Sequence, residues 1–382
     1  MVYLLVKSGY LVKVAREQLL IHGEIRDALA SLLAVPQRDL RLSSPDGYGA
    51  AALLHWDQHT FVVELLKAAS PGTISEHGNR LAAAAKRAGK KAIPLLGVAY
   101  MTEAGRRLCA AAHLSWFDLS GNSRIIAPGL RVIVDGRPNR FRGRGRPASI
   151  FAPKSARVVR WLLEHSAKPL TQRQIAHATE MTEGFVSRIV SRLLQESYVV
   201  RETSGALRLK NSDVLLDAWC DEYDFSKHTI LHGHVAARSG DALVRFVSDT
   251  LSSSSVEYAA TGLAAAWQMN HFASFRTATF FLSSQPSDEL RTALSFRDDP
   301  RGANLWLVVP NDRGVLHGAT DYDGVRCVHP VQAYIDLKAH PERAPEAADR
   351  LRKDLFAGGR ASLPKRASEY MDEQVELVRG VR

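Results

Sequence analysis

Hydrophobic and polar positions follow two alternating periods in the first third of the chain. Apolar residues recur at helical spacing from Val14 to Leu33 and stop near Pro36, which predicts one amphipathic helix. Two strand-like segments, over 49–56 and 60–66, predict a hairpin. Helical and strand periods then alternate further, with a helix over 75–88, a strand over 92–98, a helix over 102–112 and a short strand over 115–119. This order predicts an α/β domain over residues 1–135.

Three short helices with apolar stripes are predicted in the middle of the chain. The first covers 155–165 and is broken by Lys168-Pro169-Leu170. The second begins at Thr171 with a T-x-x-Q capping box, and Thr182 is placed to cap the third. The third helix is expected to bury one apolar face, made by Val186, Ile189, Val190, Leu193 and Leu194.

A predicted hairpin follows the third helix. Its strands cover 198–201 and 206–210, on either side of a turn at Thr203-Ser204-Gly205. Three helices and a hairpin in this order predict a winged helix-turn-helix domain over residues 155–211. With the phrase Q-x-x-I-A-x-x-T at 172–179, the segment resembles the winged helices of bacterial transcription regulators.

The opposite face of the third helix has the residue types that bind DNA. It displays Gly184, Ser187, Arg188, Ser191, Arg192 and Gln195. We expect Arg188 and Arg192 to read bases, because a guanidinium pairs bidentately with guanine. Short polar side chains position a protein on phosphates, and we assign that role to Thr182, Ser187, Ser191 and Gln195, with Arg208 and Lys210 of the hairpin. The alternative is that the same helices form a protein interaction module.

The rest of the chain divides by composition. Residues 136–154 are rich in Gly, Pro and Arg without apolar periodicity, which is typical of a linker. Residues 212–358 are expected to form a mixed α/β domain, and residues 359–382 a polar tail. Within the C-terminal domain the clearest predicted elements are a helix over 263–272, strands over 277–282 and 305–309, and a helical end over 330–356.

Charge sharpens this picture because it is concentrated in one stretch. The 382 residues include 50 Lys and Arg against 40 Asp and Glu, a formal net charge of +10. Residues 124–160 contain ten basic residues and one acid, so they hold +9 of that excess. A basic patch of this kind favours a nucleic acid partner. The tract ends inside the first helix of the predicted winged domain.

Composition also excludes several classes of protein. An apolar content of 46% is enough for folded cores, and three cysteines far apart provide neither a disulfide framework nor metal spacing. No stretch approaches the ~18 apolar residues of a membrane span. We therefore expect a cytoplasmic protein that binds no metal and no cofactor and contacts no membrane.

The linker contains a possible minor-groove motif. Arg142-Gly143-Arg144-Gly145-Arg146-Pro147 resembles the AT-hook core, in which Arg-Gly-Arg-Pro lies along the narrow minor groove of A·T tracts. With Arg140 these arginines are candidate DNA contacts. The alternative is a solvated basic linker that adds only nonspecific attraction to phosphates.

A second motif resembles a nuclease site. Asp46 follows Ser44-Pro45, and Glu64 stands eighteen residues later on a predicted strand, as in the PD-(D/E)XK phosphodiesterases. The lysine of that family lies two residues after the glutamate, whereas Lys67 here lies three residues after Glu64 and points to the other face of the strand. We interpret the site as inactive on a restriction-endonuclease-like fold. A Mg²⁺-dependent DNA nuclease targeted by the winged helix stays open as the alternative. His55 and His59, beside the hairpin turn, are expected to be surface residues and not metal ligands.

Three phrases resemble one known family when taken with the domain order. They are Trp116-Phe117-Asp118-Leu119-Ser120-Gly121-Asn122, the segment 258–267 beginning Tyr258-Ala259-Ala260-Thr261-Gly262, and the segment 329–337 beginning His329-Pro330-Val331-Gln332. With the winged helix they resemble the AbiEi-type antitoxin and transcription-regulator family. The resemblance implies a repressor that binds inverted repeats in its own promoter and opposes a nucleotidyltransferase toxin. In such antitoxins the winged helix usually stands near the N-terminus, so a regulator with another role is an alternative.

The sequence thus predicts a non-enzymatic, sequence-specific DNA-binding regulator. Its expected partner is double-stranded DNA, and we expect a homodimer because single winged helices usually need two half-sites. A protein partner at the C-terminal domain is a further hypothesis, with Trp267, Phe272 and Tyr334 either on a partner surface or in the core.

Overall fold

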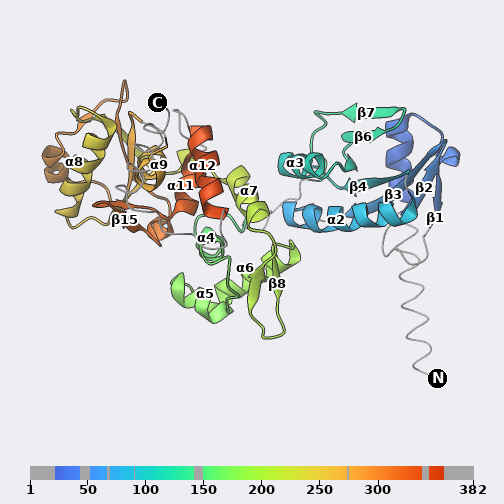
Figure 1. The fold of residues 1–382 in the computed structure, drawn as a ribbon, viewed down its shortest axis with the longest axis horizontal. Helices are drawn as coiled ribbons and strands as arrows, with labels where there is room; N and C mark the ends of the chain where they lie inside the picture. The colour runs from blue at the N-terminus through green and yellow to red at the C-terminus, as the bar shows by residue number, and fades with distance from the viewer. Residues whose placement is uncertain are drawn as a thin grey trace, which may run out of the picture. The chain divides into compact units, whose positions relative to one another are not determined.

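The computed structural model describes residues 22–43, 52–66, 69–89, 91–141, 149–272, 275–337 and 344–356. The chain divides into two compact units (Figure 1). The N-terminal unit contains residues 1–147 together with 192–200 and 213–218, and the C-terminal unit contains residues 148–191, 201–212 and 219–382. The five domain boundaries drawn from the sequence stay a prediction.

A seven-stranded sheet forms the N-terminal unit, and its strands lie side by side in chain order. They are β1 (Arg41–Ser43), β2 (Ala52–Trp56), β3 (His59–Leu66), β4 (Ala92–Val98), β5 (Ser115–Asp118), β6 (Ser123–Ala127) and β7 (Leu130–Val134). Strands β3, β4 and β5 are parallel, and the other neighbours are antiparallel. The two parallel crossovers are the helices α2 (Pro71–Ala88) and α3 (Glu103–Ala111), as the alternating pattern predicted. Ser70 caps α2, so this helix begins four residues before the predicted start.

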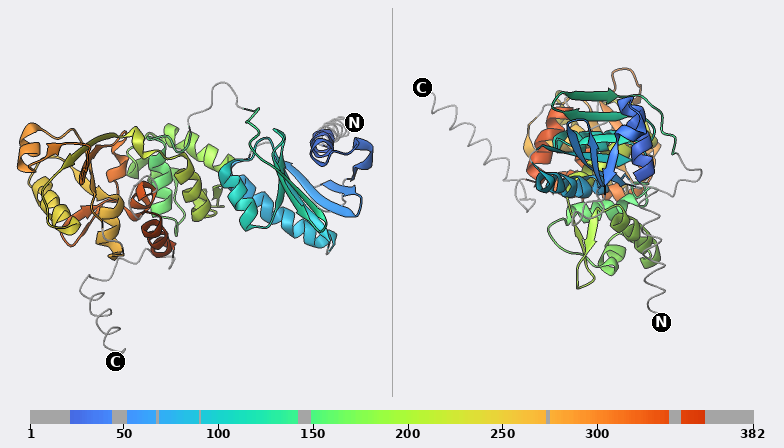
Figure 2. Two further views of the ribbon diagram at one scale, coloured as in Figure 1. Left: turned by 90° about the horizontal axis from the view of Figure 1, so that it is seen from above. Right: turned by 90° about the vertical axis from the view of Figure 1, so that its right-hand side faces the viewer.

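Helices cover both faces of this sheet. Alternate residues of β3 point to opposite sides: Val62 packs with α2 and α3, whereas Phe61 packs with the helix over residues 22–33. Figure 2 shows α2 and this first helix on the two sides of the sheet. Two separate apolar cores therefore hold the sheet in a three-layer arrangement.

The β6–β7 hairpin is an element that the sequence analysis missed. Its turn is Pro128-Gly129, with Gly129 at φ 76°, a conformation that favours glycine. Ile125 and Val132 pair across the strands and face the apolar core. The outward positions hold arginines, so the segment was interpreted only as part of a basic tract.

The C-terminal unit has a second seven-stranded sheet, with strand order β13-β10-β14-β12-β11-β16-β15. Its strands are β10 (Thr229–His234), β11 (Tyr258–Thr261), β12 (Ala278–Leu282), β13 (Arg297–Asp298), β14 (Leu305–Val309), β15 (Thr320–Tyr322) and β16 (Val325–Cys327). Its helices are α8 (Gly240–Ser252), α9 (Gly262–Asn270), α10 (Asp288–Ala293), α11 (Pro330–Leu337) and α12 (Ala344–Phe356), with short 3₁₀ turns at Phe225–Lys227 and Arg313–Leu316. The helix α7 (Ser212–Glu222) is divided between the two units.

The predicted elements of this region are confirmed where the pattern was strong. They correspond to α9, β12, β14 and the helical end, which forms α11 and α12. Tyr334 is buried and Trp267 half-buried, whereas Phe272 is 52% exposed. These three aromatic residues therefore do not form one partner surface.

The mixed α/β, multidomain fold is confirmed in this general form. The restriction-endonuclease-like assignment of the first domain stays a prediction. Within the described ranges, every helix is too short or too polar to cross a lipid bilayer.

Candidate DNA-binding interface

The central segment folds as three helices and a two-stranded wing. The elements are α4 (Ala156–Glu164), α5 (Gln172–Ala178), α6 (Glu183–Gln195), β8 (Val199–Arg201) and β9 (Leu207–Leu209). The predicted capping box is present, since Thr171 Oγ1 accepts from the Gln174 backbone N–H and Gln174 Oε1 accepts from the Thr171 N–H at 2.8 Å. A β-bridge between Leu170 and Leu207 joins the α4–α5 connection to the wing.

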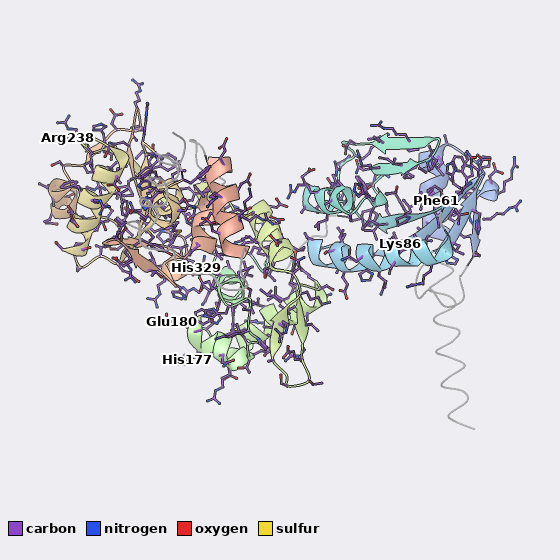
Figure 3. The ribbon with its side chains drawn as sticks, in the orientation of Figure 1. Phe61, Lys86, His177, Glu180, Arg238 and His329 are labelled. Carbon is purple, nitrogen blue, oxygen red and sulfur yellow. The ribbon has the colours of Figure 1, made fainter. Side chains whose placement is uncertain are left out.

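A tight turn separates α5 from α6. Glu180 has φ 55°, and the Met181 N–H donates to the Ala176 carbonyl at 2.9 Å. Thr182 Oγ1 accepts from the Phe185 N–H at 3.4 Å, which confirms the predicted cap. Glu180, labelled in Figure 3, is paired at 2.5 Å with Arg313 Nη2 of the C-terminal unit. This exposed ion pair joins the turn before α6 to the Arg313–Leu316 turn of the same unit.

Helix α6 separates its apolar and polar faces as predicted. Val186, Ile189, Val190 and Leu193 are buried, whereas Leu194 is only half-buried. The opposite face exposes Gly184, Arg188, Ser191 and Gln195, with Ser187 and Arg192 half-exposed. Ser191 Oγ donates to the Ser187 carbonyl at 2.8 Å, so this hydroxyl keeps its acceptor capacity toward solvent.

Arg188, one of the two arginines predicted to read bases, is the more exposed of the two on α6. Its guanidinium is exposed and lies 5.5 Å from the ring centroid of Phe185, one helical turn earlier. Lys154 Nζ lies 5.6 Å from the same ring. Phe185 thus gathers two cations beside the start of α6. The sequence analysis missed Phe185, although its i, i+3 spacing to Arg188 was visible.

Two other predicted DNA contacts have acidic partners. Arg192 Nε lies 2.7 Å from Glu196 Oε1, and Arg208 Nε lies 2.6 Å from Glu202 Oε1. The sequence analysis overlooked these two carboxylates because they stand just beyond the motif positions. These pairs engage the Nε–H of each guanidinium. Lys210 of the wing is exposed.

The basic tract is divided by the fold. Arg140 is exposed, and Arg142, Arg144 and Arg146 lie outside the described residues. Arg157 and Arg160, at the end of the tract, do not face solvent as a continuous basic arm would require. They lie on the face of α4 that packs against the C-terminal α/β domain.

Three polar residues of α4, spaced by three and four positions, form this anchoring face. Arg157 makes a bidentate ion pair with Asp312, at 2.7 and 2.9 Å. One turn later, Arg160 is 4% exposed and donates twice to Gln332 Oε1, at 3.1 and 2.6 Å. Its guanidinium also lies 5.2 Å from the Trp219 ring centroid.

Gln332 links Arg160 to a buried network of neutral and acidic groups. Its Nε2 donates to Asp336 Oδ1 at 2.8 Å, and the Tyr223 hydroxyl donates to the same oxygen. Thr261 Oγ1 donates to Asp336 Oδ2 at 2.5 Å. Burial raises the pKa of Asp336 to about 6, although these hydrogen bonds oppose the shift. Thr261, Gln332 and Asp336 belong to the two C-terminal family-like phrases, whose polar residues therefore hold α4.

The last polar residue of the anchoring face is Glu164. Its Oε1 lies 3.8 Å from Nδ1 of His329, which lies beside α4 in Figure 3. Burial raises the pKa of Glu164 to about 7, opposed by Arg160. Burial lowers the pKa of His329 to about 4, with further lowering by Arg160 and His165. The pKa of Glu164 therefore lies above its ordinary range, and that of His329 lies below it.

Glu64, the residue of the nuclease-like site that lies within the described ranges, makes structural contacts. Glu64 is 5% exposed, accepts from His77 Nδ1 at 2.9 Å and forms an ion pair with Arg80 of α2. Burial would raise the pKa of Glu64, but His77 and Arg80 outweigh it and lower the pKa. Asp46 and Lys67 lie outside the described residues. The described ranges contain no cluster of three or more His, Cys, Asp or Glu suited to a metal ion.

Both histidines of the β2–β3 hairpin were predicted to lie at the surface, but only His55 does so. His55 is exposed, and its Nδ1 lies 3.1 Å from Thr60 Oγ1. His59 is instead buried, with Nε2 2.9 Å from the Pro128 carbonyl. The β6–β7 turn, which the sequence analysis missed, covers it.

Comparison with known proteins agrees with the geometry of the central segment. Residues 152–206 match the MarR family. The chain has no significant match among curated proteins or among solved structures. The match indicates a winged-helix domain of the kind found in DNA-binding transcription regulators, and it covers α4, α5, α6 and β8.

Replacing Gln332 by Leu tests the anchor of α4. Arg160, Tyr223 and Asp336 would each lose a buried hydrogen-bond partner, so we expect the free energy of unfolding to fall by about 3 kcal/mol. Urea denaturation followed by tryptophan fluorescence measures the change. The matched control is Gln285→Leu at an exposed position of the same unit, expected within about 0.5 kcal/mol of the unaltered protein. Equal values for the two variants would contradict the anchoring role.

His329→Asn tests the titration of the anchoring face. The folded state disfavours protonated His329, so its contribution to stability is complete above its ordinary pKa of 6.5 and is lost as pH falls toward 4. Asparagine can still accept from the Val331 N–H, which donates to His329 Nδ1 at 3.2 Å. We expect the variant to lose less stability between these pH values, with a slope lower by up to about 1.4 kcal/mol per pH unit. Parallel plots of the free energy of unfolding against pH for the two proteins would contradict the titration of His329.

Glu64→Ala distinguishes a structural carboxylate from a catalytic one. Loss of its charge-assisted hydrogen bonds to His77 and Arg80 is expected to lower the free energy of unfolding of the N-terminal unit by about 2 kcal/mol. Gln58→Ala, in the exposed turn of the same unit, is the control. Unchanged stability, together with Mg²⁺-dependent plasmid cleavage that the variant abolishes, would support the nuclease alternative instead.

Proposed function

We propose that this protein is a non-enzymatic, sequence-specific DNA-binding transcription regulator that reads the major groove with α6. The observation that carries the proposal is the exposed polar face of α6, with Arg188 held beside Phe185, inside the segment that matches the MarR family. This face contains no carboxylate from Gly184 to Gln195, so a phosphate backbone meets no repulsion there.

Arg188 and Arg192 have different roles in this proposal. Arg188 is exposed without an acidic partner among the described residues, and it pairs with a guanine edge. Arg192 first releases Glu196 and then contacts a base or a phosphate. Thr182, Ser187, Ser191 and Gln195 position the helix on the backbone, and Arg208 and Lys210 bring the wing to the adjacent phosphates.

The basic arm adds a second kind of contact. Arg140, Arg142, Arg144 and Arg146 would follow the minor groove next to the major groove occupied by α6. Such contacts are mainly electrostatic, so they strengthen binding to every sequence and depend steeply on salt.

The biological role follows from the resemblance to AbiEi-type antitoxins. We infer a homodimeric repressor that binds an inverted repeat and acts beside a toxin. The buried network at Asp336 supports the use of the family-like phrases in holding the DNA-binding helices. Within the described residues no observation favours the nuclease alternative over this one.

Selection of bound duplexes from a random pool, followed by anisotropy titrations, tests the proposal. Arg188→Ala should lower discrimination between the selected and a scrambled duplex by about 10- to 100-fold, which corresponds to one bidentate base contact. Arg144→Ala should weaken binding to both duplexes and lower the salt slope by about 1. Arg238→Ala, at an exposed site of the C-terminal unit labelled in Figure 3, is the control. Isotherms that none of these changes alter would show that α6 is not the reading helix.

A further inference from the structure

The outer face of the β6–β7 hairpin is an unusual mixture of arginine and isoleucine. Arg124 pairs across the strands with Ile133, and Ile126 pairs with Arg131. Directly paired and alternate residues share a face of a sheet, so these four side chains form one surface. Both arginines are exposed, and each isoleucine is 45% exposed. We call this surface the hairpin face.

The chain leaving β7 is held beside the end of β5. Asn122, fully buried, accepts from the Arg137 N–H at 2.8 Å and donates to the Arg137 carbonyl at 3.1 Å. Ser120 Oγ accepts from the Arg140 N–H at 3.3 Å. The Asp118 carboxylate in turn accepts hydrogen bonds from the backbone N–H and from the side-chain amide of Asn122, both at 2.9 Å. The start of the linker is therefore attached to the N-terminal unit.

Four exposed arginines result from this arrangement, two on the hairpin face and two on the attached linker. Among the residues that the structure describes, Arg124, Arg131, Arg137 and Arg140 have no ion-pair partner. Asp135, the only carboxylate from residue 124 to 141, is paired with Arg106 of α3. The surface therefore keeps an uncompensated positive charge suited to a polyanion.

We propose that the hairpin face, with Arg137 and Arg140, is a second DNA-contact surface that binds phosphates next to the sequence read by α6. This proposal rests on the proposed function and assigns a DNA-binding role to the N-terminal unit. Arg124 and Arg131 are diagonal neighbours on paired strands, where Cα atoms are about 7–8 Å apart, so the two side chains can contact separate phosphates. The isoleucines support the aliphatic stems of the arginines beside the sugars.

Chain length favours DNA as the occupant over an acidic protein. Eight residues separate Arg140 from Ser149, so the Cα atoms of these two residues can be no more than roughly 30 Å apart. One turn of DNA is about 34 Å long, which is comparable with that limit, so we infer that one duplex serves both surfaces. Tethering to the winged helix raises the effective concentration of the same polyanion at this surface.

The double variant R124Q/R131Q in the full chain tests the surface. Anisotropy is measured with the selected and the scrambled duplex between about 50 and 200 mM salt. We expect the salt slope to fall by about 1.8 for two lost phosphate contacts, with affinity about tenfold lower on both duplexes and discrimination unchanged. R124K/R131K keeps both charges and should retain the slope.

Two further variants make the result decisive. R238Q/R301Q removes two exposed arginines of the C-terminal unit and matches the loss of charge, and it should leave the slope unaltered. R137Q/R140Q, outside the strands, should lower the slope even if the strand variant proved unstable in thermal unfolding. If R124Q/R131Q and R137Q/R140Q both behave like R238Q/R301Q, the hairpin face does not bind DNA, and an acidic protein partner becomes the better explanation.

Arg188→Ala in the same assay separates this proposal from the proposed function. Lost discrimination in Arg188→Ala with no effect of the hairpin variants overturns only the second surface. A lower slope in the hairpin variants with intact discrimination in Arg188→Ala supports the surface and overturns the reading role of α6. Absence of binding by the unaltered protein overturns both.

Discussion

The arrangement of the winged helix depends on the burial of one guanidinium, that of Arg160. A buried charge is costly unless its hydrogen bonds are satisfied, and Gln332 satisfies two of the donors while the Trp219 ring lies beside the group. The neutral amide of Gln332 can do this only because Asp336 and Tyr223 hold its other end. Helix α4 is therefore fixed to the C-terminal α/β domain by polar contacts that apolar packing would not specify.

This attachment links the C-terminal domain to the helices that we propose to bind DNA. Arg157, Arg160 and Glu164 face Asp312, Gln332 and His329, and the turn before α6 meets Arg313 through Glu180. Both the first helix and the start of the reading helix thus contact the same domain.

The described arginines considered above have three different environments, and in only one of them is the side chain exposed without an acidic partner. Arg160 is buried, Arg157, Arg192 and Arg208 are paired with carboxylates, and Arg124, Arg131 and Arg188 are exposed without acidic partners among the described residues. Net charge along the sequence does not distinguish these environments. Among the described residues of the basic tract over 124–160, Arg124 and Arg131 lie on the N-terminal sheet, whereas Arg157 and Arg160 lie in the α4 anchor.

The sequence by itself determined the features that depend on residues close together in the chain. The capping box at Thr171, the two faces of α6 and the strands β3 and β4 follow from the spacing of neighbouring residues, so they were predictable. The partners of Arg160, Arg192 and Glu64 were decided by tertiary structure. Gln332 lies 172 residues from Arg160, and the spacing of Glu64 from His77 and Arg80 has meaning only once α2 packs on β3. Burial and charge pairing depend on contacts between distant segments, and these are set by packing of the whole fold.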